Sequence, residues 1–300
     1  MKGTWLGIVI CVGSLWAQKT EPEVYSPLGK AYFSRPDPSG VVAKADLAMR
    51  QGGDKADLIL EAARARDQFF RFAESIPIYT RGMQLYPDDV RFPRYRGHRL
   101  LSIRRFEAAL VDLKAASTLA PSSFDVAYHL GLAYFLRGDY NHAAREYSRC
   151  LAMGDKPKPA FLHGLPTDWR ACYALDDDSR VALTDWTYRA LRRAGKAVEA
   201  RQLLDRITEK MTVKENTAYH RALLFYKGLR TVEQTIEGRE TGNSFATAAY
   251  GVAGFQRQEG QSERSCELLN RITGDENWSA FGVIGAETDL SRGACGPKKK

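Results

Sequence analysis

A chain of 300 residues with a formal net charge of +8 is long enough for one or two globular domains, or for an array of repeats. Its lysines and arginines are scattered, a distribution that is typical of the solvated faces of helices. Aromatic residues do not alternate with the basic run Arg91–Phe106, which holds six arginines, so the sequence argues against a nucleic-acid-binding protein.

Residues 1–17 have the pattern of a secretory signal peptide. Lys2 supplies the positive start, an apolar run extends from Trp5 to Trp16, and Ala17 ends a possible cleavage site. The run is too short to span a bilayer comfortably, so we expect no transmembrane span in the mature chain. The sequence predicts an exported protein, periplasmic or extracellular. The alternative is that these residues form a buried N-terminal helix.

The segment 18–40 contains several prolines and little periodicity, so it predicts an extended linker. Apolar residues at helical spacing then predict a helix over Val41–Gln51, which stops at Gly52 and Gly53. We expect this helix to cap the first edge of the region 41–157.

Within that region a 34-residue period aligns three windows without a gap, at residues 56–89, 90–123 and 124–157. Positions 8, 20 and 27 of every window carry small residues, which let paired helices approach closely. These nine residues are Ala63, Gly97, Gly131, Ser75, Ala109, Ala143, Gly82, Ala116 and Cys150. Proline follows near the end of each window, at Pro87, Pro121 and Pro157, and cannot continue a helix.

The third window carries Leu130-Gly131, Tyr134 and Gly138-Asp139-Tyr140, and with these residues it resembles the tetratricopeptide repeat (TPR) family. The resemblance implies an all-α fold, a right-handed superhelical α-solenoid of TPR helix hairpins, and at least three repeats are usually needed for stability. The alternative is a helical bundle without a repeat.

Within residues 158–292 the sequence predicts a short helix over Thr167–Leu175 and then irregular TPR-like helical pairs, and residues 293–300 predict a basic disordered tail. The overall layout is similar to the NlpI-like group of bacterial envelope proteins. Members of that group are lipoproteins, whereas no small residue precedes Cys11 here to make a lipoprotein processing site.

The chain has five cysteines, and removal of the leader would remove Cys11. The four that remain are an even number, which permits disulfides in an exported chain. We expect pairing in sequence order, Cys150 with Cys172 and Cys266 with Cys295. The alternative is that Cys150 and Cys266 are small packing residues on second helices.

Motifs for chemistry are absent from the sequence. The five histidines make no convincing metal-binding pair, and there is no glycine-rich phosphate loop and no serine in a nucleophile elbow. We therefore predict a protein that is not an enzyme and needs neither a metal nor another cofactor.

First helices of successive TPR repeats line a concave groove, and positions 2, 5, 9 and 12 of each window are expected to face it. The candidate groove residues are Arg64, Arg91, Arg94, His98, Tyr128 and Phe135. Guanidinium groups pair well with carboxylates, and aromatic rings supply contact area, so we expect an acidic or C-terminal peptide as ligand. The alternative is that these arginines are only solvated groove lining.

The sequence thus favours a non-catalytic protein–protein interaction scaffold of the bacterial cell envelope, which binds a protein or peptide segment in its groove. The alternative is an envelope hydrolase, or an accessory subunit of a wall-processing enzyme. The sequence is also compatible with a homo-oligomer.

Overall fold

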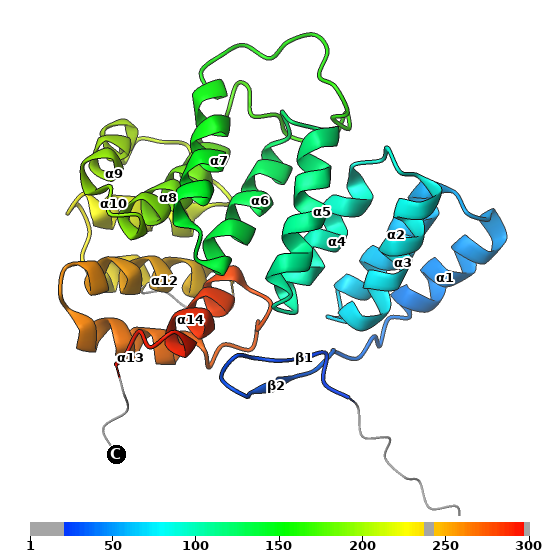
Figure 1. Ribbon diagram of the computed structural model, residues 1–300, viewed down its shortest axis with the longest axis horizontal. Helices are drawn as coiled ribbons and strands as arrows, with labels where there is room; N and C mark the ends of the chain where they lie inside the picture. Colours follow the sequence, from blue (N-terminus) through cyan, green and yellow to red (C-terminus); the bar gives the residue numbers. More distant parts are fainter. Residues whose placement is uncertain (1–20, 237–242, 297–300) are drawn as a thin grey trace, which may run out of the picture.

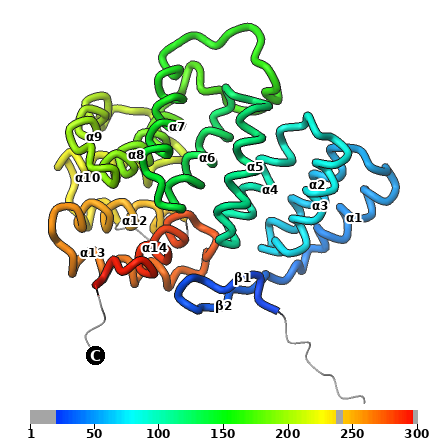
Figure 2. Tube along the Cα trace, in the orientation of Figure 1, coloured from blue at the N-terminus to red at the C-terminus, as the bar shows by residue number. Residues whose placement is uncertain are grey.

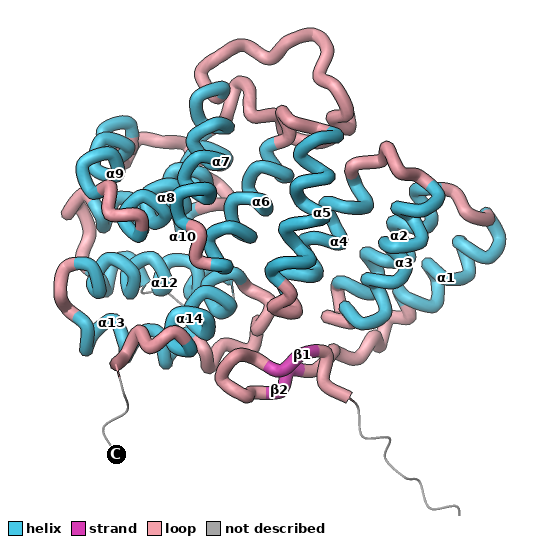
Figure 3. The backbone as a smooth tube through the Cα atoms, viewed as in Figure 1, coloured by secondary structure: helices cyan, strands magenta, loops and turns pink. Residues whose placement is uncertain are grey.

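The structure, a computed structural model, describes residues 21–236 and 243–296 (Figure 1). The leader predicted for residues 1–17 and the end of the predicted tail, from residue 297, lie outside these ranges. The described part is a chain of helices in which neighbours in sequence pack against each other, with one short two-stranded sheet (Figure 3). No helix in these ranges is long and apolar enough to cross a membrane. The predicted all-α solenoid of helix hairpins is confirmed.

The elements follow one another as β1 (Val24–Tyr25), β2 (Ala31–Tyr32), α1 (Val41–Gly52), α2 (Ala56–Asp67), α3 (Phe72–Leu85), α4 (Arg91–Ser102), α5 (Phe106–Leu119), α6 (Phe124–Arg137), α7 (Tyr140–Met153), α8 (Asp177–Arg193), α9 (Ala197–Leu203), α10 (Thr217–Tyr226), α11 (Val232–Ile236), α12 (Asn243–Gln258), α13 (Ser262–Ile272) and α14 (Phe281–Ser291).

The 34-residue period of the sequence reappears in the helices. The second helices of the three hairpins, α3, α5 and α7, begin at Phe72, Phe106 and Tyr140, each 34 residues after the one before. All nine small residues at positions 8, 20 and 27 are buried. A Cβ added at Gly131 would overlap the ring of Tyr147, so the small residues leave room for large neighbours.

The turn inside each hairpin uses a residue with positive φ, again at a spacing of 34. These residues are Phe70 (φ 57°), Arg104 (φ 62°) and Gly138 (φ 97°). Glycine adopts this conformation readily, whereas a larger residue needs tertiary contacts to hold it there. Phe70 packs against the ring of Trp278, with centroids 5.2 Å apart, and Arg104 donates to the carbonyl of Trp278 at 2.8 Å. The segment before α14 therefore stabilises both strained turns.

The N-terminal segment contradicts the prediction of an extended linker over 18–40. Within its described part β1 and β2 form an antiparallel hairpin that lies beside the C-terminal segment (Figure 2). The ring of Tyr32 stacks on Trp278 at 5.3 Å, and the Trp278 indole donates to the carbonyl of Phe33 at 3.2 Å. The contacts that hold this hairpin come from Trp278, far away in the sequence, so the prolines of the segment could not reveal it.

The second half keeps helical pairs, but its helices vary in length, from the 5 residues of α11 to the 17 of α8, and they lack the strict period. The short helix expected over Thr167–Leu175 is not formed. The backbone there instead makes an antiparallel bridge between Ser123 and Ala171, and the amide of Cys172 donates to the carbonyl of Ser122 at 2.8 Å. Asp176 caps the N-terminus of α8 by accepting from the amide of Ser179 at 2.7 Å.

Two disulfide bonds join Cys150 to Cys172 and Cys266 to Cys295, and close loops with sequence separations of 22 and 29 residues. Cys150 is also fully buried on α7 at one of the small positions, so it serves packing and cross-linking together. The first bond fastens the loop between α7 and α8 to the third hairpin, and the second fastens the chain after α14 to α13.

Full-length protein that is denatured without reductant is expected to titrate no more than one thiol, that of Cys11, because the other four sulfurs are bonded in pairs. A thiol-reactive dye measures this number directly, and the same sample treated with reductant gives the control value. A titration of five thiols before reduction would contradict the pairing.

Candidate functional site

Two cavities lie along the first helices of the repeats. One, of about 510 Å³, is bordered by α1, α2, α4 and the loop that carries Trp169; we name it the N-terminal groove. The other, of about 530 Å³, lies between α4, α6, α10, the start of α12 and the loop before α14; we name it the central chamber. Both have the size of ligand sites in proteins.

A cation and two aromatic rings form one wall of the N-terminal groove. The guanidinium carbon of Arg64 lies 5.4 Å from the ring centroid of Tyr95, and Arg64 is exposed to solvent. Tyr95 in turn meets Trp169 edge to face at 6.0 Å. This wall presents a positive charge beside flat apolar surface, and it belongs to three different elements: α2, α4 and the loop between α7 and α8.

Arg91 also borders the N-terminal groove, but acidic neighbours occupy its guanidinium. It donates to Asp89 from Nε at 2.9 Å and to Asp57 from Nη1 at 2.7 Å. Hydrogen bonds to Asp89, and then to Asp57, raise the pKa of Arg91 above its ordinary value despite partial burial. The groove is therefore mixed in charge rather than a basic patch. Its charged residues are Lys44, Arg64, Arg91, Asp57, Glu61 and Asp168.

Arg94 is buried behind the N-terminal groove and does not line it. Its side chain is 9% exposed, and Nη2 donates to Asp125 at 2.6 Å. Burial opposes ionisation of Asp125, but Arg94 and His129 outweigh it and hold the pKa of this carboxyl below its ordinary value. The guanidinium carbon of Arg94 lies 4.5 Å from the Tyr95 ring centroid. Arg94 thus supports the aromatic wall from within.

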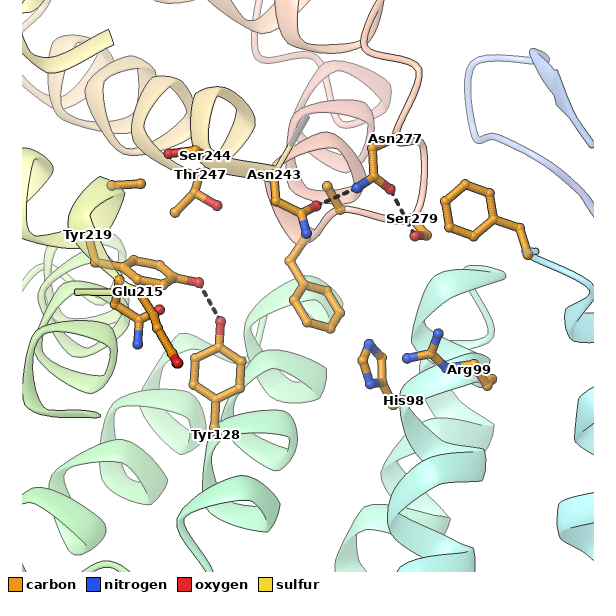
Figure 4. A pocket seen from close by; sticks show the side chains of 15 residues that line it. His98, Arg99, Tyr128, Glu215, Tyr219, Asn243, Ser244, Thr247, Asn277 and Ser279 are labelled. Atoms are coloured by element: carbon orange, nitrogen blue, oxygen red, sulfur yellow. Dashed lines mark hydrogen bonds between the residues drawn. The ribbon is translucent and has the colours of Figure 1, made fainter. Parts of the chain in front are cut away.

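His98 and Tyr128 line the central chamber instead of the groove (Figure 4). The His98 ring packs 4.4 Å from His129 and 5.2 Å from Phe281, between centroids. Burial, together with the charges of Arg99 and Arg94, lowers the pKa of His98 well below 6.5, so the imidazole is neutral at pH 7. Its buried Nδ1 has no hydrogen-bond partner within the described ranges.

Phe135 was expected in the groove, and that expectation is wrong. Its side chain is 3% exposed and meets Trp186 at 5.1 Å and Tyr250 at 6.3 Å. Position 12 of the third repeat would face a concave surface in an open array. Here α8 and α12 cover it, because the second half of the chain folds against α6.

Several lining residues were not predicted. Tyr95 and Arg99 occupy positions 6 and 10 of the second window, and the matching residues of the first window, Glu61 and Ala65, also border the groove. Adding positions 6 and 10 to the four groove-facing positions of each window would have identified Tyr95 and Arg99. Trp169, Tyr219, Asn243 and Asn277 come from outside the regular repeats, so no period could have indicated them.

The described ranges contain no group of three or more histidine, cysteine, aspartate or glutamate side chains placed to hold a metal ion. His220 lines neither cavity. Its Nε2 lies 2.8 Å from the carbonyl oxygen of Thr208, and this contact orients the ring. The two cavities are lined by guanidinium, ammonium, carboxylate, imidazole, amide, hydroxyl and aromatic groups.

No family model matches the chain. No curated protein matches it significantly in sequence. Among solved structures, it is similar to a tetratricopeptide repeat protein from Parabacteroides merdae ATCC 43184, with a TM-score of 0.52 and 15% sequence identity over 84% of this chain and 91% of that chain. At that identity the likeness concerns the fold alone. The chain thus has an all-α fold similar to that of a tetratricopeptide repeat protein.

Proposed function

We propose that the protein is a non-catalytic scaffold of the bacterial cell envelope that binds an extended peptide segment in the N-terminal groove. The observation that carries this proposal is the exposed guanidinium of Arg64 above the ring of Tyr95, at 5.4 Å, in a cavity of about 510 Å³. Such a wall suits a peptide that carries a carboxylate next to an apolar group, because the guanidinium pairs with the carboxylate and the rings pack against the apolar group.

The charges of the groove define the peptide further. Asp57 is occupied by Arg91, at 2.7 Å, whereas Lys44 and Arg64 are exposed on α1 and α2. An acidic residue of the ligand is therefore expected near Lys44 and Arg64, and an aromatic or aliphatic residue against Tyr95 and Trp169. Glu61 and Asp168 would disfavour a peptide that is acidic throughout.

Two features support the envelope as the place of action. The leader-like residues 1–17 favour export. The two disulfide bonds are typical of proteins in an oxidising compartment.

The test compares partners recovered from the envelope by tagged protein and its variants after crosslinking. Arg64→Glu reverses the exposed charge of the groove, and Trp169→Ala removes half of its aromatic wall. Each is expected to weaken partner binding at least tenfold, because central aromatic and arginine residues dominate such interfaces. Affinity for the identified partner is then measured with purified components.

The matched control is Arg145→Glu. Arg145 is exposed on α7 and lines neither cavity, so the same change of charge there is expected to leave binding within twofold of wild type. Thermal melts of all three variants establish that they are folded. A partner that binds Arg64→Glu and Trp169→Ala as tightly as wild type would refute binding in the N-terminal groove.

A further inference from the structure

Aromatic rings form the walls of the central chamber. Phe281 lies 5.2 Å from His98 and 6.4 Å from Tyr128, between ring centroids. Tyr219 lines the cavity on the side opposite His98 (Figure 4). The cavity of about 530 Å³ is bordered by residues from both halves of the chain. A flat apolar group of a ligand could pack here against the faces and edges of these rings, since aromatic groups prefer offset-stacked or edge-to-face contacts.

The tyrosines leave one hydroxyl hydrogen without an acceptor. The hydroxyl oxygens of Tyr128 and Tyr219 lie 2.5 Å apart, and the Trp186 indole N–H donates to them at 3.1 and 3.3 Å. Whichever tyrosine donates to the other, the second hydrogen has no partner within the described ranges. Burial raises the pKa of both hydroxyls, so both keep their protons at neutral pH. The chamber therefore contains an unused O–H donor.

The amides at the rim are also arranged as donors. Asn277 donates through Nδ2 to Oδ1 of Asn243 at 2.6 Å, and the hydroxyl of Ser279 donates to Oδ1 of Asn277 at 3.1 Å. Each amide oxygen thus accepts one hydrogen bond within the rim. Among the described residues no acceptor takes the two Nδ2 hydrogens of Asn243, which can therefore donate to a ligand.

Arg99 provides the positive charge of the chamber. Its side chain is 13% exposed, and its closest acidic contact is Nε to Oδ2 of Asp67 at 3.6 Å, which is too long for a good hydrogen bond. Asp67 instead accepts a hydrogen bond from Tyr79 at 2.6 Å. Arg99 lies beside His98 on α4, across the cavity from the loop that carries Asn277 and Ser279 (Figure 4).

The ion pair that Arg99 forms is with Asp67 and not with Glu215, the acidic residue that lines the chamber. Glu215 is exposed at the rim and forms an ion pair with Arg170 at 3.5 Å. The interior thus combines one guanidinium with N–H and O–H donors that have no partner among the described residues, and Nδ1 of His98 also lacks one there. Its ligand should carry acceptor oxygens and a single negative charge. A phosphate dianion would bring more charge than one buried guanidinium can compensate.

We propose that the central chamber binds a small organic carboxylate with a flat, apolar body, its carboxylate at Arg99 and its body among Phe281, Tyr128 and His98. This site is separate from the N-terminal groove and does not depend on the function proposed for it. The same chemistry has two sources: a free carboxylate, or the C-terminal residue of a polypeptide.

The probe is N-acetylphenylalanine, compared by titration calorimetry with its uncharged carboxamide. The acid is expected to bind at least tenfold more tightly, because a charge-assisted pair with the guanidinium exists only for the carboxylate. Arg99→Gln should abolish this preference. Arg64→Gln, the matched change in the N-terminal groove, should retain it.

A second variant avoids the buried charge of Arg99. Asn243 is exposed at the first turn of α12, where a negative charge favours the helix, so Asn243→Asp is expected to fold normally. In the chamber the new carboxylate replaces a donor and repels the ligand, so affinity for the acid should fall at least tenfold while affinity for the carboxamide changes less. The proposal is overturned by equal affinity of acid and carboxamide, by unchanged affinity in Asn243→Asp, or by the lack of saturable binding at millimolar acid.

Competition separates the two sources. A glycine–serine pentapeptide ending in phenylalanine with a free carboxylate is titrated against bound N-acetylphenylalanine. Displacement supports the proposal with a polypeptide C-terminus as ligand. Binding of N-acetylphenylalanine without displacement supports it with a free carboxylate. In both cases Arg64→Gln should behave as wild type.

Discussion

Replacing Glu287 by alanine is expected to lower the free energy of unfolding by about 3–5 kcal/mol, the usual cost of leaving one partner of a buried ion pair alone. Glu287 is 1% exposed on α14, and it accepts from the hydroxyl of Tyr32 at 2.5 Å and from Arg104 at 2.7 Å. Arg104 is 5% exposed, so without Glu287 its charge would remain buried and uncompensated. Arg104 also has positive φ, and this contact helps to hold it.

Denaturant unfolding followed by circular dichroism measures the loss. Two controls accompany it. Glu287→Gln keeps the shape and part of the hydrogen bonding, so it should cost less than the alanine variant. Glu107→Ala removes an ion pair with Arg137 that is largely exposed, and should cost no more than about 1 kcal/mol. If Glu287→Ala were no more damaging than Glu107→Ala, the contact between α14 and the N-terminal repeats would not stabilise the fold.

The substitution of glycine by alanine is expected to have opposite effects at two helical positions. At Gly131 in α6 an added Cβ would overlap the ring of Tyr147, which is fully buried. Because that ring has little room to move, Gly131→Ala should destabilise the protein by about 1–3 kcal/mol. At Gly254 in α12 an added Cβ would have no described atom within 4 Å beyond its chain neighbours and its own helix backbone, so alanine should stabilise by about 0.5–1 kcal/mol through helix propensity.

Comparing the two variants in one unfolding experiment cancels the contribution that glycine makes to the unfolded chain, since that term is similar at both sites. The midpoint should fall for Gly131→Ala and rise for Gly254→Ala. A rise for both would mean that close packing at the small positions does not hold the hairpins together.

The regular repeats could be derived from the sequence because their determinants are local. The small residues at positions 8, 20 and 27 face the neighbouring helix, and the spacing of 34 recurs both in the starts of α3, α5 and α7 and in their preceding turns. Each hairpin packs mainly on its neighbours in sequence. A periodic pattern is therefore enough to place those helices.

The candidate site was only partly predictable, because only some of its determinants are local. Positions within the repeat place Arg64 and Arg91 correctly at the N-terminal groove. They do not reveal that Arg94 is turned inward to Asp125, or that α8 and α12 cover Phe135. Burial of those two side chains depends on which other elements arrive, and a repeat pattern carries no information about that.

The sequence by itself determined the helix hairpins, their period and the small residues at their contacts. The tertiary structure alone decided that β2 meets α14, through Tyr32 and Glu287, which are 255 residues apart, and that Trp169 and Asn277 complete two cavities. The physical reason is the range of the interactions. Helix formation and hairpin packing depend on residues a few tens of positions apart, whereas the closing contacts join single side chains from distant segments, which leave no period in the sequence.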